Sequence, residues 1–358
     1  MNITENAKNI IDNCRFCWMC RHICPIGNAT GHERNTARAR AFAISMVERG
    51  VTPLAEVVDN VYECTLCGAC TNNCMTGFDP KVFIQETKTE ILLSGLAPDY
   101  VLALVEKAMQ TGNIYGEKMP ASLEALYSDK GDVLFLAGND ACIKAPECVS
   151  LALSLLKKAG VNPAFTSLQD TGAALWFLTG KTSETQSAAA NFAKHANNYK
   201  TVVVYDPTDL ALIRHEYKEW GIDTTAEFIS FNEYLLSLIK AGSLKVKRGD
   251  KEYTLQDHAA YARDLDDTES GRALIAAVGT SREMLLNGKE ANLAGQLIMA
   301  EYMPDVMKQV ALDRWTNAIN MDCKCLVTES PAEYVALKNT APEGYSVISV
   351  EEMLAENL

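Results

Sequence analysis

From about residue 130, the chain alternates between two kinds of hydrophobic pattern. Short, uninterrupted apolar runs at 131–138 (GDVLFLAG) and 201–207 (TVVVYDP) are typical of buried strands. Amphipathic segments follow them at 146–160 and 208–221, and a glycine ends the first of these. Strands that alternate with helices in this way predict parallel α/β layers.

The first hundred residues have a helical pattern instead. The segment 35–50 (NTARARAFAISMVERG) predicts a helix with Asn35 or Thr36 as its cap. A second helix is predicted over 53–64, with Pro53 near its start. We therefore expect the N-terminal domain to be built of helices.

The α/β pattern occurs twice. Residues 200–213 and 324–337 align at a fixed offset of 124, and both read as a strand, a polar residue, a proline and a helix. The tetrapeptides 170–173 (DTGA) and 293–296 (LAGQ) correspond at nearly the same offset. A tandem pair of similar α/β units explains both correspondences.

Composition and charge narrow the function classes. The 358 residues are 48% hydrophobic, which suffices for the cores of two or three domains. We find no secretory signal and no apolar run near the roughly 18 residues of a membrane span. A net charge of −13 argues against nucleic acid as a ligand. We expect a cytoplasmic protein that reaches the inner face of a membrane only through partners.

One group of positive charge stands out on this acidic chain. Arg34, Arg38 and Arg40 lie close together in the N-terminal part. They predict a local positive patch, which is either a solvated helix face or a docking surface.

Twelve cysteines are many for a chain without an export signal, and such cysteines are typical of metal or redox sites. Eight of them form two runs spaced C-x2-C-x2-C-x3-C, and a proline follows the first run whereas Met75 follows the second. The runs are Cys14, Cys17, Cys20 and Cys24, and Cys64, Cys67, Cys70 and Cys74.

This spacing predicts two 4Fe-4S clusters with crossed ligands. Three thiolates on a tight turn reach three irons of one cube, and the fourth binds the neighbouring cluster. One cluster is therefore assigned to Cys14, Cys17, Cys20 and Cys74, and the other to Cys64, Cys67, Cys70 and Cys24. Zinc is the main alternative, but its sites pair two C-x2-C hairpins a dozen or more residues apart.

Neighbours of the cysteines can tune the reduction potential, although each also has an ordinary packing explanation. The sequence predicts that four apolar side chains shield the clusters and that Arg21 or His22 places positive charge nearby. The apolar residues are Trp18, Met19, Leu66 and Ala69.

Two cysteine runs followed by two α/β units resemble the layout of the CCG family of iron–sulfur subunits. That family includes iron–sulfur subunits of glycolate oxidase, anaerobic glycerol-3-phosphate dehydrogenase and heterodisulfide reductase. The resemblance implies a helical ferredoxin domain at 1–100, a helical linker at 101–129, and degenerate CCG-like α/β repeats at 130–245 and 246–358. It also implies anaerobic electron transfer with an FAD-containing partner.

The chain departs from the family where the second set of ligands would be. The family has cysteines at each Cys-Cys-Gly and at each strand-to-helix turn, whereas those turns read Asp206-Pro207-Thr208-Asp209 and Ser330-Pro331-Ala332-Glu333. Without thiolates these positions cannot hold a noncubane cluster. The family's disulfide-cleaving chemistry is therefore not expected here.

Other candidate groups have ordinary explanations. Asp170, Asp206 and Asp209 would suit a divalent cation, but capping and turn chemistry account for them as well. Four cysteines outside the runs are expected to be buried and inert, and a third cluster or a reactive dithiol is the alternative. They are Cys142, Cys148, Cys323 and Cys325, and the last two are predicted to share one strand face.

No acid–base pair, nucleophile elbow or phosphate-binding loop is recognisable, which favours a relay over an enzyme. We expect an electron-transfer subunit that serves an FAD-containing dehydrogenase of the 2-hydroxy acid or glycerol-phosphate type. The second carrier would be a ferredoxin, an electron-transfer flavoprotein or a quinone-linked protein. Two alternatives stay open: a heterodisulfide reductase-like enzyme that uses the remaining cysteines, and a non-redox scaffold stabilised by its clusters.

Overall fold

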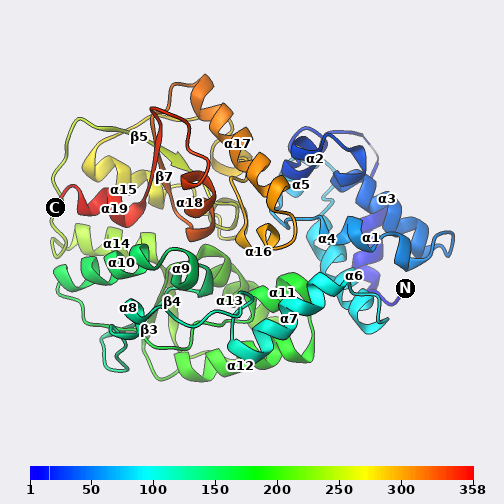
Figure 1. The fold of residues 1–358 in the computed structure, drawn as a ribbon, viewed down its shortest axis with the longest axis horizontal. Helices are drawn as coiled ribbons and strands as arrows, with labels where there is room; N and C mark the ends of the chain where they lie inside the picture. Colours follow the sequence, from blue (N-terminus) through cyan, green and yellow to red (C-terminus); the bar gives the residue numbers. More distant parts are fainter. Residues whose placement is uncertain (16) are drawn as a thin grey trace.

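The computed structural model describes residues 1–15 and 17–358, and it places the N-terminal helices beside two α/β regions (Figure 1). The N-terminal helices are α1 (Glu5–Asn13), α2 (Pro25–Thr30), α3 (Ala37–Glu48), α4 (Val58–Tyr62), α5 (Ala69–Asn72), α6 (Pro80–Leu93), α7 (Asp99–Thr111) and α8 (Ala121–Glu124). Two 3-10 turns, η1 (Glu33–Asn35) and η2 (Leu54–Glu56), complete this part.

Local signals explain where these helices begin. Thr36 caps α3 through a side-chain bond from the Ala39 amide, as the sequence predicts. The helix predicted at 53–64 is wrong as a single element, because a 3-10 turn after Pro53 gives way to α4 only at Val58. Such 3-10 turns are common at the N-termini of helices.

The first α/β region contains a four-stranded parallel sheet in the order β2-β1-β3-β4. Its strands are β1 (Val133–Leu136), β2 (Pro163–Ala164), β3 (Thr201–Val204) and β4 (Glu227–Ser230). Its helices are α9 (Asn139–Lys144), α10 (Pro146–Lys158), α11 (Ala173–Thr179), α12 (Ser183–Ala196), α13 (Pro207–Glu219) and α14 (Phe231–Lys240). The strands and helices predicted between 131 and 221 are confirmed.

The second α/β region has the equivalent strand order, β6-β5-β7-β8, and its strands are also parallel. The strands are β5 (Glu252–Gln256), β6 (Thr280–Ser281), β7 (Cys325–Thr328) and β8 (Ser346–Ser349). The helices are the π-helix η3 (Ala260–Asp264), α15 (Ser270–Val278), the 3-10 turn η4 (Gly288–Glu290), α16 (Leu297–Ala300), α17 (Pro304–Asn320), α18 (Pro331–Lys338) and α19 (Val350–Ala355).

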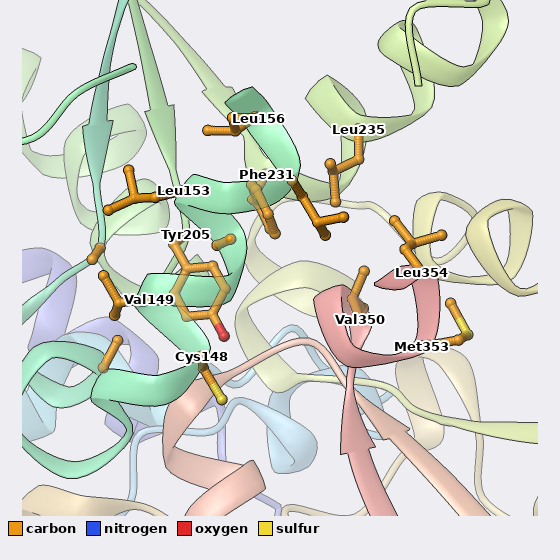
Figure 2. Packing of buried hydrophobic residues seen from close by; sticks show 14 of the residues in the cluster. Cys148, Val149, Leu153, Leu156, Tyr205, Phe231, Leu235, Val350, Met353 and Leu354 are labelled. Carbon is orange, nitrogen blue, oxygen red and sulfur yellow. The ribbon is translucent and has the colours of Figure 1, made fainter. Parts of the chain in front are cut away.

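The two α/β regions share a hydrophobic core. Figure 2 shows Tyr205 and Phe231 of the first region close to Val350 and Leu354 of the second. The Tyr205 hydroxyl donates a 2.7 Å hydrogen bond to the buried Glu351 carboxylate. Burial of each large apolar side chain contributes about 1.5–3 kcal/mol, so the two regions stabilise each other.

A second core joins the N-terminal helices to both α/β regions. It includes Phe83 of α6, Leu178 of α11 and Met307 of α17, and α17 also contacts α2. This packing fixes the position of the cysteine runs against the rest of the chain. Within the described residues, we find no helix whose length and hydrophobicity would let it cross a membrane.

Candidate metal centre

The first cysteine run lies between the end of α1 and the start of α2. Cys14 ends α1, and its amide donates to the Ile11 carbonyl at 3.2 Å. Cys24 begins α2, and its sulfur accepts from the Gly27 amide at 3.4 Å. Cys17 is exposed, whereas the other three cysteines of this run are partly buried.

The two runs share one left-handed backbone position. Trp18 and Gly68 each stand four residues after the first cysteine of their run, and their φ angles are +73° and +72°. This left-handed region is costly for any residue other than glycine, so the shared conformation indicates a shared structural requirement. The Arg38 guanidinium lies 3.8 Å from the centroid of the Trp18 ring and holds that side chain.

Cys24 lies with three cysteines of the other run. One pocket is lined by Cys24, Cys64, Cys67 and Cys70, together with Arg40, Lys81 and apolar residues. This is the grouping that the crossed assignment predicts for the second cluster. Iron ligation itself stays a prediction.

The last cysteine of the second run lies near the start of the first. The Thr76 hydroxyl donates to the Asn13 carbonyl at 3.0 Å, next to Cys14 in the chain. The Cys74 sulfur lies 3.2 Å from the same hydroxyl. This placement fits the other half of the crossed assignment, in which Cys74 joins the first run.

Burial controls the acidity of the thiols. It raises the pKa of Cys70 well above its usual value, and the neighbouring Cys67 and Cys64 add to the effect. It also raises the pKa of Cys20 to about 11. Burial alone would raise the pKa of Cys74 too, but hydrogen bonds, first from Thr76, outweigh it and lower that pKa. Crowded, buried thiols ionise only when a positive centre such as iron stabilises the thiolates.

The donor set fits a cluster better than a single ion. Within 1–15 and 17–358, no three His, Cys, Asp or Glu side chains lie close enough together to hold one metal ion. The four thiolates of a cubane bind four different irons and are spread around a larger space. All predicted donors are sulfur, the ligand type that iron–sulfur clusters use.

The predicted shielding of the cysteines is half right. Leu66 and Ala69 are buried and line the pocket with the cysteines. Trp18 and Met19 are 51% and 42% exposed, so the prediction that they shield a cluster from water is wrong. The left-handed backbone at Trp18 accompanies this exposed position, and the Arg38 guanidinium covers one face of the indole instead.

The predicted patch of three arginines is also wrong. Arg40 is 2% exposed and lies inside the domain, because its guanidinium binds backbone carbonyls there. Arg34 pairs with Glu63, and Arg38 pairs with Glu33 at 2.6 Å. Two of the three arginines thus have surface carboxylate partners, although Glu33 also pairs with Arg21, and the third arginine is buried.

The four remaining cysteines are buried, and the structure does not bring them together as a set. Cys142, Cys148 and Cys325 belong to the core shared by the α/β regions, and burial raises the pKa of each. Cys323 belongs to a separate cluster around Trp315. The prediction that Cys323 and Cys325 share a strand face is wrong, because β7 begins only at Cys325.

The three aspartates have hydrogen-bonding roles in a cap, in a turn and in the bond that Asp209 accepts from Thr171. Asp206 caps α13 by accepting from the Thr208 amide at 2.8 Å, and Asp170 accepts from the Gly172 amide at 2.9 Å. Burial raises the pKa of Asp206 to about 7 and that of Asp209 well above its usual value. Within the described residues, these side chains are not part of any group of three or more His, Cys, Asp or Glu that could hold a metal ion.

Sequence reasoning missed the contacts between the second cysteine run and the C-terminal half. Arg263 donates to the Cys67 carbonyl at 2.8 Å, and Lys81 pairs with Asp264. Both contacts come from η3. Since 196 residues separate Arg263 from Cys67, no local pattern in the sequence signals them.

Comparison with known proteins agrees with the N-terminal architecture. The family model described as "4Fe-4S dicluster domain" matches residues 10–78, a range that contains all eight cysteines of the two runs.

Two relatives extend the similarity beyond that domain. One is a subunit of the dihydromethanophenazine:CoB–CoM heterodisulfide reductase of Methanosarcina acetivorans, which is 23% identical over 372 residues that cover 92% of this chain and 89% of the relative. The other is the crystal structure of a hypothetical protein from Helicobacter pylori, with a TM-score of 0.61 and 12% identity, in a match that covers 99% of this chain and 73% of that one. The second comparison shows similarity of fold alone.

Proposed function

We propose that this chain, an iron–sulfur electron-transfer subunit of the CCG type with a 4Fe-4S dicluster domain, relays electrons for an FAD-containing dehydrogenase subunit. The observation that carries the proposal is the packing of the two cysteine runs, which places Cys24 in one pocket with Cys64, Cys67 and Cys70. Two clusters so close together would accept the two electrons of a flavin one at a time.

We assign the ligands residue by residue. Cys14, Cys17, Cys20 and Cys74 would hold the first cluster, and Cys64, Cys67, Cys70 and Cys24 the second. The clusters would supply one-electron redox chemistry. The chain would hold the sulfurs on two segments that share a left-handed position, and the buried Leu66 and Ala69 would keep water from the second set.

The partner is proposed from the family resemblance. It would be an FAD-binding dehydrogenase subunit that oxidises a 2-hydroxy acid or glycerol phosphate. A ferredoxin, an electron-transfer flavoprotein or a quinone-linked protein would be the other carrier. Similarity to a heterodisulfide reductase subunit supports a place in a multi-subunit redox complex.

We further propose that the α/β regions are degenerate tandem repeats, at 130–245 and 246–358, that dock the flavoprotein. The ferredoxin domain would be residues 1–100, and 101–129 would link it to the repeats. Support comes from the equivalent strand order of the two sheets and from β3 and β7, which begin at Thr201 and Cys325.

A second candidate is a heterodisulfide reductase-like enzyme, which the relative from Methanosarcina acetivorans favours. It would require thiol chemistry at the four cysteines outside the runs. Their burial, the raised pKa values of Cys142, Cys148 and Cys325, and the separate location of Cys323 favour the relay.

Iron counting on anaerobically prepared chain distinguishes the candidates. Two cubanes give about eight irons per chain, and a third cluster would give clearly more. The EPR spectrum should then show both clusters reduced by dithionite, and by a co-purified dehydrogenase with its substrate. An iron-free or zinc-filled protein would contradict the proposal, and clusters that no reductant reaches would favour a structural role.

A further inference from the structure

Arg40 is a buried cation at the centre of the N-terminal domain. It projects from α3 and is 2% exposed. Its guanidinium donates to the carbonyls of Asn60 and Glu63, each at 2.9 Å, and to that of Asn35. All three acceptors are neutral backbone groups, so these bonds orient the guanidinium without balancing its charge.

No carboxylate forms an ion pair with Arg40 in the described part of the chain. The charge of Glu63 also acts on Arg40, but the Glu63 carboxylate hydrogen-bonds to Arg34 and to the Asn35 amide instead. An unpaired buried charge costs several kcal/mol, so this position needs a negative partner of another kind.

The negative partner that lies next to Arg40 is sulfur. Nη1 of Arg40 lies 4.0 Å from the Cys24 sulfur, and Arg40 lines the pocket that Cys24 shares with Cys64, Cys67 and Cys70. An arginine guanidinium keeps its charge in proteins, so Arg40 presents a fixed positive charge to these sulfurs. Four thiolates around a cubane give the site net negative charge.

We propose that Arg40 is the counter-charge of the second cluster and raises its reduction potential. The inference rests on the proposed function, because it needs a cluster at Cys24, Cys64, Cys67 and Cys70. An added electron makes the cluster more negative, and a fixed positive charge beside it stabilises that reduced state. Arg40 thus acts as a positioning residue, through electrostatics rather than by contact with iron.

Two other cations near the cysteines have carboxylate partners, whereas the buried Lys88, which interacts with Cys64, donates to the Phe177 carbonyl. Lys81 lines the same pocket but pairs with Asp264, and Arg38 pairs with Glu33. Arg38 lies on the same helix as Arg40 and is therefore a matched control.

The test is an EPR-monitored redox titration of the holoprotein with Arg40→Gln, Arg40→Lys and Arg38→Gln. Arg40→Gln keeps an amide donor but removes the charge. We expect it to weaken electron binding at the second cluster at least tenfold, a shift of about 59 mV to more negative potential for a one-electron couple. Arg40→Lys and Arg38→Gln should each stay within a third of that shift.

If the second cluster of Arg40→Gln has the wild-type reduction potential, the counter-charge proposal is overturned. The proposed relay function would be unaffected. If Arg40→Gln loses the second cluster, iron content decides: retention by Arg40→Lys supports the counter-charge, and equal loss by Arg40→Lys overturns it. A wild-type protein without clusters would instead contradict the proposed function itself.

Discussion

At the scale of single residues, the fourth cysteine of each run lies near the other run. Cys24 belongs to the first run by sequence but lies in the pocket of the second. Cys74 belongs to the second run by sequence but lies beside Thr76, which binds the segment before Cys14. Both placements favour the crossed assignment.

Exchanging Cys74 for serine tests this arrangement. We expect Cys74→Ser to disturb the same EPR signal as Cys17→Ser and to leave the signal that Cys67→Ser removes, because crossed ligation puts Cys74 on the first cluster. Cys142→Ala, a buried cysteine outside both runs, should retain both signals. If Cys74→Ser instead matched Cys67→Ser, the ligand assignment would be wrong.

At the scale of elements, the left-handed position that the two runs share makes a backbone prediction. Gly68 precedes α5 with φ +72°, and an added Cβ would meet only Arg263 and Lys81 side-chain atoms at 3.6 Å, an ordinary contact. Gly68→Ala should therefore cost about 1–2 kcal/mol of unfolding free energy through backbone strain alone. Urea denaturation of the holoprotein measures it.

Gly249→Ala is the control for that prediction. Gly249 does not have a left-handed φ, and its added Cβ would meet nothing closer than 3.8 Å. This variant should be neutral or slightly stabilising, since alanine restricts the unfolded chain. Equal effects of the two substitutions would show that the turn is not strained.

The elements that could be predicted from the sequence are those with strong local signals. The buried runs of β1 and β3 and the proline-started α10 and α13 were readable because hydrophobic period and breakers agree there. The break before Val58 could not be predicted, because the segment 53–64 has a helical composition throughout and only packing selects the 3-10 turn. Likewise, the spacing of the eight cysteines predicts two runs but could not show that Arg40 is buried between them.

At the scale of the whole molecule, the Tyr205–Glu351 hydrogen bond connects the two α/β regions through their common core. Burial raises the pKa of Glu351 from 4.5 to about 7, and bonds from Ser349 and Tyr205 oppose the shift. A folded-state pKa above the unfolded value means that the folded protein binds the extra proton. The contribution of Glu351 to stability should therefore increase as the pH falls from about 8 towards 5, whereas buried His258, whose pKa is lowered to about 3, acts in the opposite direction below about pH 6.5.

Glu351→Gln should flatten that pH dependence, because the amide cannot ionise. Buried Asp206 and Glu333, with pKa values raised to about 7 and about 8, contribute with the same sign, so part of the slope should remain. Glu343→Gln, at an exposed position, should leave the profile unchanged. Unfolding free energies of the wild type, Glu351→Gln and Glu343→Gln, measured from pH 8 to pH 5, test these expectations. A Glu351→Gln profile as steep as wild type would exclude Glu351 as a source.

The π-helix η3 makes contact with all three parts of the chain. Arg263 holds the Cys67 carbonyl, Asp264 pairs with Lys81, and the Asp264 carbonyl lies 2.8 Å from the His215 ring of α13. The five-residue η3 contacts the second cysteine run and elements around both sheets. Its local unfolding would therefore weaken the packing of all three parts of the chain at once. Local unfolding of η3 would also remove the bond by which Arg263 holds the Cys67 carbonyl, beside the proposed second cluster.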